Sequence, residues 1–210
     1  MQNRHIDRKR YFDELAKTSE EFYIDYLKPY KNIGPGCKVL EIGCGEGGNL
    51  LPFAQAGCKV AGLDLAAGKI DNARKFFATL ETEGEFACAA FLKTNPFEND
   101  GLFDIILIHD VIEHIEPEGK DAFFERLKMY LKPDGIIFFA FPAWQMPFGG
   151  HQQICRSKVC SKVPFMHVLP VFMYKAWLKL FGEQKDKIDE LLSIKRSRMT
   201  PEKFEKLCAG

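Results

Sequence analysis

The feature that most constrains the fold is a short apolar run that leads into a cluster of glycines. Residues 38–43, Lys-Val-Leu-Glu-Ile-Gly, have the composition of a strand buried in a parallel sheet, interrupted by one acid. Four glycines then fall within the six residues 43–48. Glycine tolerates positive φ and lets a ligand approach bare backbone. A strand, a glycine-rich turn and a helix in this order predict a binding site at the turn.

Strand-like and helical patterns alternate over most of the chain. Further strands are expected at residues 59–64, 85–92, 103–109 and 136–141, and helices at 7–30, 49–56, 67–80 and 117–131. Residues 132–135, Lys-Pro-Asp-Gly, are expected to form a turn. Repeated strand and helix units imply parallel strands with right-handed crossovers. The predicted fold is therefore a Rossmann-like, doubly wound α/β fold, with a mostly parallel sheet and helices on both faces.

The periodicity stops after Pro142. Residues 142–170 carry Pro, Gly, Trp and His without a regular pattern, which indicates a long functional loop. A helical C-terminal segment follows, with helices expected at 171–181, 183–194 and 201–208, the last capped by Thr200. Its aromatic residues are expected mainly in the helix core: Phe172, Tyr174, Trp177 and Phe181.

The length of 210 residues favours a single domain. We divide it into an N-terminal helical cap (1–32), a cofactor-binding core (33–142) and an acceptor loop with helices (143–210). Lys plus Arg and Asp plus Glu total 29 each, so no overall charge favours nucleic acid. From His151 onward basic residues exceed acidic ones by 12 to 6, which fits an anionic substrate, a membrane leaflet or, more ordinarily, a solvated helix surface.

The composition also predicts a compartment. The polar start lacks the pattern of a signal peptide, and no apolar run approaches the ~18 residues of a membrane span. The seven cysteines show no paired C-x-x-C spacing, so we expect free thiols, with no zinc and no disulfide. The sequence therefore predicts a cytoplasmic protein; it does not indicate an oligomeric state.

The amino-acid sequence of the glycine-rich turn is compatible with two kinds of cofactor. Gly43, Gly45 and Gly48 match the G-x-G-x-x-G of a dinucleotide site, and Asp64 follows about 20 residues later, where an acid can bind a ribose. The acid at Glu41 favours a cationic cofactor without phosphate, because a carboxylate would repel a pyrophosphate. S-adenosylmethionine, with its sulfonium and ammonium groups, has that character. Glu46 and Asp64 also favour S-adenosylmethionine over a dinucleotide. The alternative for Glu41 is a structural role, in which its carboxylate pairs with a nearby basic group or a backbone amide.

At this point the residues resemble a known family. Val39-Leu-Glu-Ile-Gly-Cys-Gly-Glu-Gly47 resembles the first motif of the class I S-adenosylmethionine-dependent methyltransferases, and Gly62-Leu-Asp-Leu65 their second strand end. Residues 103–114 and 131–135 resemble their fourth strand and the turn before the fifth. The resemblance implies a site for S-adenosylmethionine, with S-adenosylhomocysteine as the product. The implied cofactor-binding residues are Glu41, Gly43, Cys44, Gly45, Asp64, Leu65, Phe91, Leu92 and His109.

The resemblance also assigns positions within the cofactor. Gly43 and Gly45 would lie under the methionine moiety, Asp64 would bind the ribose hydroxyls and Leu65 would touch the adenine. Two departures stand out. Residues 89–97 contain no acid for the adenine amino group, so backbone groups around Phe91 and Leu92 would substitute. Residues 143–210 show no antiparallel strand pair, so either the chain stops before those strands or the sheet is shorter than in the family.

Methyl transfer needs a base only if the acceptor must lose a proton. The candidate catalytic residues are His109, Asp110, His114 and His151. Ordinary alternatives are a core hydrogen bond for His114 and a loop-ordering role for Asp110. With Glu113, the residues Asp110, His114 and His151 also resemble the metal site of small-RNA 2′-O-methyltransferases, and similar runs occur in quinone-pathway O-methyltransferases. We predict no metal, because Glu-His pairs are common in methyltransferases that need none.

The leading interpretation is methyl transfer to a small-molecule acceptor covered by the loop 144–153, whose apolar and amide groups suit an organic molecule. Three alternatives remain: a metal-assisted RNA 2′-O-methyltransferase, an NAD-dependent oxidoreductase, which the acid at Glu41 disfavours, and a cofactor-binding partner protein without catalysis. The neutral overall charge makes nucleic acid an unfavoured partner.

Overall fold

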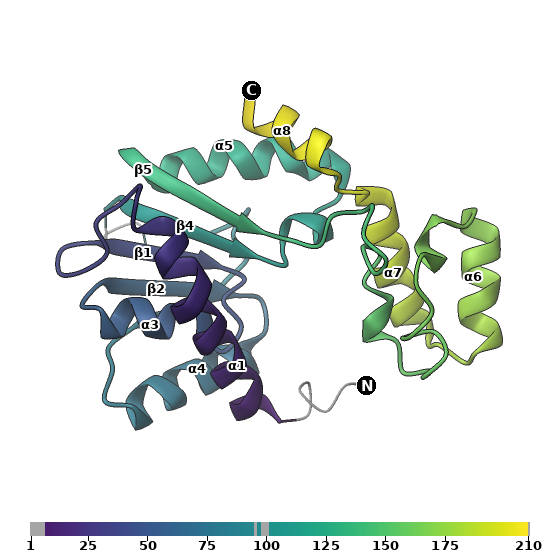
Figure 1. Ribbon diagram of the computed structural model, residues 1–210, viewed down its shortest axis with the longest axis horizontal. Helices are drawn as coiled ribbons and strands as arrows, with labels where there is room; N and C mark the ends of the chain where they lie inside the picture. Colours follow the sequence, from purple (N-terminus) through teal and green to yellow (C-terminus); the bar gives the residue numbers. More distant parts are fainter. Residues whose placement is uncertain (1–6, 95, 98–100, 210) are drawn as a thin grey trace. The chain divides into compact units, whose positions relative to one another are not determined.

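The structure is a computed structural model that describes residues 7–94, 96–97 and 101–209 (Figure 1). It divides into two compact units. The sheet unit contains residues 7–109 and 125–140, and the helical unit contains residues 110–124 and 141–209. The chain passes between the units after residue 109, at the end of a strand, after residue 124, within a helix, and after residue 140, at the end of another strand. The single-domain organisation stays a prediction.

A sheet of five parallel strands forms the centre of the sheet unit. The strands are β1 (Lys38–Ile42), β2 (Lys59–Asp64), β3 (Glu85–Cys88), β4 (Phe103–His109) and β5 (Leu131–Ala140). Their order is β3-β2-β1-β4-β5, and every neighbouring pair is parallel. The predicted doubly wound α/β fold is confirmed. The strand order reverses beside β1, so the carboxyl ends of β1 and β4 form the switch point at which such sheets bind ligands.

Helices of the sheet unit are α1 (Arg8–Thr18), α2 (Ile24–Leu27), α3 (Leu51–Gln55), α4 (Ala67–Thr79) and the second half of α5 (Lys120–Tyr130). Val39, Ile105 and Leu107 belong to one buried cluster with residues of α1, α3 and α4. Alternate residues of the same strands, such as Leu40 and Ile106, are fully buried as well. Because successive side chains of a strand point to opposite faces, both faces of the sheet are covered.

The first predicted helix differs from expectation in a way that matters for the site. Helical structure ends at Leu27 rather than at residue 30, and a π-helical turn, Ser19–Tyr23, separates α1 from α2. The buried Ser19 hydroxyl donates a 2.7 Å hydrogen bond to the carbonyl oxygen of Asn49. A π turn inserts one residue into a helix and is often found near functional sites. Here it brings Ser19 onto the segment that follows the glycine cluster.

Three strand boundaries also differ. β1 ends at Ile42, one residue earlier than predicted, and β3 ends at Cys88 rather than at residue 92. The predicted turn at 132–135 is wrong as a separate element, because these residues fall inside β5. They form an irregularity in it: Phe103 pairs with Leu131, but Ile105 pairs with Ile136. Lys31 stabilises this irregularity by donating hydrogen bonds of 2.7 Å to the backbone and side-chain oxygens of Asp134.

The helical unit contains α6 (Val171–Leu180), α7 (Lys185–Ser197) and α8 (Pro201–Ala209), besides the start of α5. The three predicted helices are confirmed with shifts of a few residues, and the Thr200 hydroxyl caps α8 by accepting from the Lys203 backbone N–H at 3.2 Å. Within residues 142–170 the structure has only the short 3₁₀ turns Gln152–Ile154 and Met166–Val168. No helix among the described residues has the length and apolar content needed to cross a bilayer.

A separate small core holds the helical unit together. It lies between α6 and α7, which run side by side (Figure 1), and the loop that precedes them. Its buried members are Cys155, Cys160, Tyr174, Leu178, Ile188 and Leu191. The buried Glu183 carboxylate joins this loop to the helices by accepting hydrogen bonds from the backbone N–H groups of Arg156 (3.2 Å) and Ser157 (2.7 Å). All seven cysteines are free thiols.

Candidate functional site

The turn after β1 is shaped by three glycines with positive φ: Gly43 at 76°, Gly45 at 54° and Gly47 at 81°. Such values strain other residues. The backbone N–H groups of Gly43 and Cys44 both donate to the carbonyl oxygen of Leu63, at 2.8 and 3.0 Å, which fastens the turn to the end of β2. The Cys44 side chain is buried, and its Sγ atom donates to the Gly45 carbonyl oxygen at 3.7 Å.

The glycines of the turn serve different purposes. A Cβ atom at Gly45 would meet nothing within 4 Å, so the space above this residue is open. A Cβ at Gly47 would lie 2.8 Å from the Phe86 ring, and one at Gly48 would lie 2.6 Å from the Phe12 carbonyl oxygen. Gly47 and Gly48 are therefore required for close packing. Gly45 is left to present bare backbone to a ligand.

Asp64 ends β2 beside this open space. Its Oδ2 atom accepts from the Gly45 backbone N–H at 3.0 Å, and its Oδ1 atom accepts from the Ala66 backbone N–H at 2.8 Å. These bonds hold the carboxylate in place, and the Lys69 ammonium group lies 3.7 Å from Oδ2. Each oxygen can still accept from a further donor. Leu65, the next residue, is 76% exposed and offers an apolar surface. The roles of Asp64 in binding ribose and of Leu65 in contacting adenine stay predictions.

A buried polar row connects β1 to β4. The Nδ2 atom of Asn49 donates a 2.7 Å hydrogen bond to Oε1 of Glu41 and lies 3.1 Å from Nδ1 of His109. With both amide hydrogens donated in this way, Nδ1 of His109 accepts and Nε2 carries the ring proton. The catalytic role of His109 stays a prediction. Sequence reasoning missed Asn49, because its role depends on a partner 60 residues away.

The Glu41 carboxyl group is 1% exposed, and burial raises its pKa to about 8, against a lowering by the Asn49 hydrogen bond and a further rise from Asp64. Its Oε2 atom has no hydrogen-bond partner among the described residues. Among the described residues Glu41 has no basic partner, because the group that contacts it is the side-chain amide of Asn49. A positively charged donor at Oε2 would stabilise the ionised form.

Glu46 has a different role from Glu41. Its buried carboxylate is ion-paired with the Arg8 guanidinium, whose Nε atom donates at 2.7 Å. The charge of Glu46 is therefore compensated within the protein, and the argument that it favours a cationic cofactor is wrong. The pair instead fastens the start of α1 to the glycine-rich turn. Arg8 lies 38 residues before Glu46, so no local pattern indicates this contact.

The segment after β3 contains the two residues predicted to contact adenine. Phe91 is buried, with its ring centroid 5.3 Å from that of Tyr130 and the Arg126 guanidinium 5.7 Å above it. Its side chain is used in packing on α5. Leu92 is 43% exposed. The contribution of their backbone groups to cofactor binding stays a prediction.

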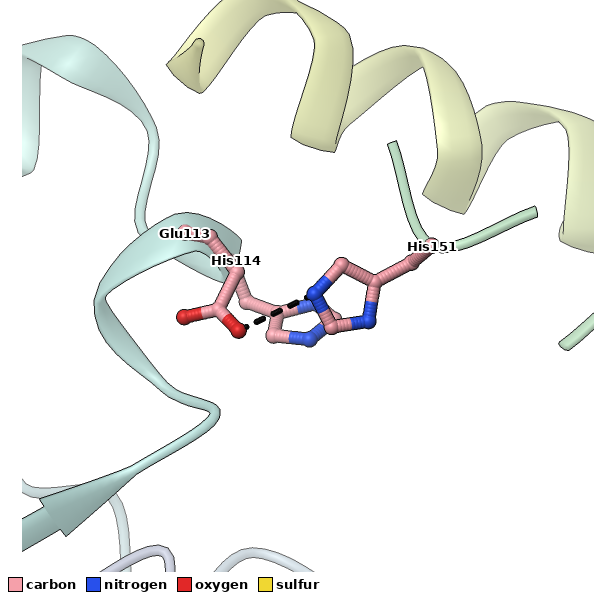
Figure 2. Close-up of side chains that lie close together, drawn as sticks. All are labelled: Glu113, His114 and His151. Carbon is pink, nitrogen blue, oxygen red and sulfur yellow. Dashed lines mark ion pairs between the residues drawn. The ribbon is translucent and has the colours of Figure 1, made fainter. Parts of the chain in front are cut away.

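The helical unit contains a second group of candidate side chains (Figure 2). Glu113 and His114 lie on the 3₁₀ turn Ile112–His114, and His151 projects toward them from the loop. One ligand atom from each of the three lies within 4.8 Å of the others. The His151 Nε2 atom is 3.1 Å from Oε1 of Glu113, and the two imidazole rings meet edge to face with centroids 5.2 Å apart. Asp110, with φ of 53°, is not a member of this group.

The electrostatics of this Glu-His-His group separate its two imidazoles. Burial lowers the pKa of His114, although Glu113 partly opposes the effect. Burial also lowers the pKa of His151, but the direct contact with Glu113 outweighs it and the net shift is upward. Glu113 is 1% exposed, and neither of its oxygens has a hydrogen bond of good geometry with any described residue. Two imidazoles beside a buried carboxyl group can move a proton, and the same atoms can hold a divalent ion.

Lys120 supports the turn that carries Glu113 and His114. Its buried ammonium group donates to the carbonyl oxygens of Ile112 (2.6 Å) and Ile115 (2.8 Å) and to the Ser197 hydroxyl (2.9 Å). Burial lowers its pKa to about 8. The lysine thereby joins the 3₁₀ turn to the end of α7. Sequence reasoning did not identify Lys120, because a lysine in the first turn of a helix is ordinarily exposed.

The loop predicted to cover the acceptor begins with a buried tryptophan. The Trp144 backbone N–H donates to the Met199 carbonyl oxygen at 2.8 Å, and Nε2 of the buried His167 donates to the Trp144 carbonyl oxygen at 2.9 Å. The Trp144 and His167 rings meet edge to face at 4.5 Å. Trp144 thus anchors the loop, and the covering role of residues 144–153 stays a prediction.

These features define an α/β protein with a glycine-rich ligand site at the switch point of its sheet. Residues 39–135 match the family described as methyltransferase domain. The chain is similar to the ubiquinone biosynthesis O-methyltransferase of Rhodopseudomonas palustris (strain HaA2), at 34% identity over 50% of this chain and 40% of that protein. It is also similar to phosphoethanolamine N-methyltransferase 1 of Zea mays, at 28% identity over 93% of this chain and 40% of that protein.

A solved structure shares the fold. The S-adenosylmethionine-dependent methyltransferase of Clostridium acetobutylicum ATCC 824 superposes with a TM-score of 0.57 at 18% identity, over 67% of this chain and 58% of that one. The match over residues 39–135 and these similarities support a class I S-adenosylmethionine-dependent methyltransferase. The chain spans 40% of the length of the two curated relatives named above.

Proposed function

We propose that this chain transfers the methyl group of S-adenosylmethionine to a small-molecule acceptor. The observation that supports this most is the buried Glu41, whose Oε2 atom lacks a partner among the described residues, two positions before the open turn that begins at Gly43. An unpartnered buried acceptor costs about 1–3 kcal/mol unless a ligand donor reaches it. The cofactor carries an ammonium group that can serve as this donor.

The other cofactor contacts follow from the fixed groups of the turn. Asp64 would accept from the ribose hydroxyls with the lone pairs that Gly45 and Ala66 leave free. Leu65 would lie against the adenine with its exposed side chain. His109, held by Asn49, would donate from Nε2 toward the methionine end. When bound, the cofactor supplies an activated methyl group, and the protein contributes position and exclusion of water.

We propose that the acceptor is a small molecule bearing a hydroxyl or amino group, and not a nucleic acid. The net charge of zero gives no attraction for phosphate backbones. The two curated relatives are named ubiquinone biosynthesis O-methyltransferase and phosphoethanolamine N-methyltransferase 1. The proton that such an acceptor loses would go to His114, whose lowered pKa keeps it neutral near pH 7. The pair of Glu113 and His151 would orient that ring, and Asp110 is the further candidate at this end.

The test is formation of S-adenosylhomocysteine from S-adenosylmethionine and a panel of catechols, phenols and primary amines. We expect turnover with at least one acceptor and a loss of 10²–10⁴-fold in kcat for His114→Gln, the size usual for a general base, with an unchanged cofactor Kd. Asp189→Asn, at an exposed site on α7, is the matched control. Binding of the cofactor without turnover of any acceptor would instead indicate a non-catalytic cofactor-binding protein.

A divalent ion held by Glu113, His114 and His151 is a second candidate for this group. It is favoured by the buried Glu113 carboxylate without hydrogen bonds and by the convergence of three ligand atoms. After treatment with a chelator, addition of Mg²⁺, Mn²⁺ or Zn²⁺ should raise Tm, and His151→Ala should abolish the rise. An unchanged Tm with all three ions, together with unchanged activity after chelation, would contradict a metal site and leave acid-base catalysis as the proposed role of this group.

We further propose that the protein works in the cytoplasm. The seven cysteines have no paired C-x-x-C spacing, which favours free thiols over a disulfide framework. Free thiols persist in a reducing compartment. Fractionation of cells that express the chain with a terminal tag would test this; recovery from an oxidising compartment would contradict it.

A further inference from the structure

Helix α6 of the helical unit is apolar on the side that faces solvent. Its inward side chains, Tyr174 and Leu178, are fully buried in the small core, and Trp177 packs against the same core. On the opposite side, Phe172 is 74% exposed and Leu180 is 79% exposed. A surface helix of a globular protein normally turns polar residues outward. The outward side of α6 does not follow this rule.

The outward residues fall on one face. Phe172, Lys175, Lys179 and Leu180 have the spacing i, i+3, i+7 and i+8, which places them together on a helix. Met173, also exposed, lies next to Leu180 by the same geometry. We call these five residues the α6 outer face. Neither lysine of this face has an ion-pair partner in the described part of the chain.

The chain that leads into α6 extends the same character. Phe165, Val168 and Val171 precede or begin the helix, and all three are exposed. Residues 135–182 contain no Asp or Glu at all. The same stretch contains five basic residues, Arg156, Lys158, Lys162, Lys175 and Lys179. The segment therefore combines exposed large apolar side chains with positive charge only.

We propose that the α6 outer face docks on the surface of an anionic lipid bilayer. A helix with apolar side chains and lysines on its outer side can lie in the plane of the interface, with the apolar groups among the acyl chains and the ammonium groups at the headgroups. Lysines suit this position, because their aliphatic stems can lie along apolar surroundings while the charge reaches the phosphates.

The charge distribution favours a lipid surface over a second copy of this chain. A symmetric dimer through the outer face would bring Lys175 and Lys179 of both copies together, with no acid between residues 135 and 182 to offset them. An anionic bilayer offers opposite charge and an apolar layer at once. The docking surface is separate from the glycine-rich turn, so the proposal does not depend on the proposed methyl transfer.

The test is flotation of the whole chain with vesicles of pure phosphatidylcholine and with vesicles containing equal parts of phosphatidylcholine and phosphatidylglycerol. We expect binding to the anionic vesicles, little binding to the neutral ones, and weaker binding as salt is raised. Leu180→Gln and Phe172→Gln should each reduce partitioning by about tenfold or more, since each removes a large apolar side chain from the interface. The double variant Lys175→Gln, Lys179→Gln should remove the preference for anionic lipid.

Met129→Gln is the matched control, because Met129 is 71% exposed but lies in the sheet unit; it should bind vesicles as the unaltered chain does. All substituted side chains are exposed, and unchanged Tm values would verify that the fold is retained. Equal binding by all variants, or no binding to anionic vesicles, would overturn the proposal. A dimer in solution that Leu180→Gln dissociates would also overturn it, in favour of a second copy on this face.

Discussion

Binding of S-adenosylhomocysteine near neutral pH should release about one proton from Glu41. With a pKa of about 8 in the free protein, roughly 90% of this carboxyl group is protonated at pH 7. The ammonium group of the ligand stabilises the carboxylate, so the pKa of Glu41 falls on binding. About 0.9 proton then leaves at pH 7, and the affinity should rise by up to about tenfold per pH unit between pH 6 and pH 8.

Titration calorimetry in buffers of different ionisation enthalpy measures this proton directly. The observed enthalpy should change with buffer at pH 7 and lose most of that dependence above pH 9. Glu41→Gln keeps an oxygen for the Asn49 hydrogen bond but has no proton to release, so its enthalpy should be independent of buffer and its affinity lower. A buffer-independent enthalpy for the unaltered chain would refute the placement of Glu41 at the ligand.

Three more outcomes follow from the structure. The raised pKa of Glu41 means that the folded state holds this proton more tightly than the unfolded chain. The free energy of unfolding, measured with urea, should therefore fall by up to about 4 kcal/mol from about pH 5 to pH 9. The fall should be smaller in Glu41→Gln. Gly47→Ala should lower the free energy of unfolding by about 2–4 kcal/mol, because of the positive φ and the clash with Phe86. Gly45→Ala should lower stability less and cofactor affinity more. Equal effects of the two variants on both quantities would refute the assignment of Gly47 to packing and Gly45 to the ligand. Lys120→Met should destabilise by about 2 kcal/mol and lower kcat with little change in cofactor Kd; unchanged stability and kcat would show that the turn does not need it.

The sequence predicts the sheet well because its strands are strongly apolar and buried on both faces. β4 is expected and found at Phe103–His109, and β2 at Lys59–Asp64. The π turn at Ser19–Tyr23 had no local signal, because the bond that supports it, from Ser19 to Asn49, joins distant segments. The irregularity inside β5 likewise depends on the contact of Lys31 with Asp134.

In the candidate site too, features set by neighbouring residues could be predicted, whereas contacts between distant residues could not. The backbone of the turn and Asp64 could be predicted, since glycines and an acid at fixed spacing carry the signal. Glu46 was assigned to the ligand because its distant partner, Arg8, is not apparent in the sequence. The converging Glu113 and His151 were recognised as a pattern, but their 3.1 Å contact required the fold.

The aromatic residues of α6 were expected in the helix core. This is confirmed for Tyr174, which is fully buried, and wrong for Phe172, which is 74% exposed. Aromatic side chains occur on both the buried and the exposed side of this helix, so the sequence pattern did not separate Tyr174 from Phe172. The exposed face became visible only when the small core around Tyr174 and Leu178 was located.

We propose that the bend after β1 accepts a cationic sulfur compound, through Glu41 and Asp64, in preference to a phosphate-bearing nucleotide. Calorimetric titration of the whole chain with S-adenosylmethionine, S-adenosylhomocysteine and NAD under identical conditions tests this preference. We expect binding of the first two, weakened at least tenfold by Asp64→Asn and unaffected by the exposed control Asp71→Asn, with no heat from NAD. Binding of NAD with no response to either sulfur compound would contradict it.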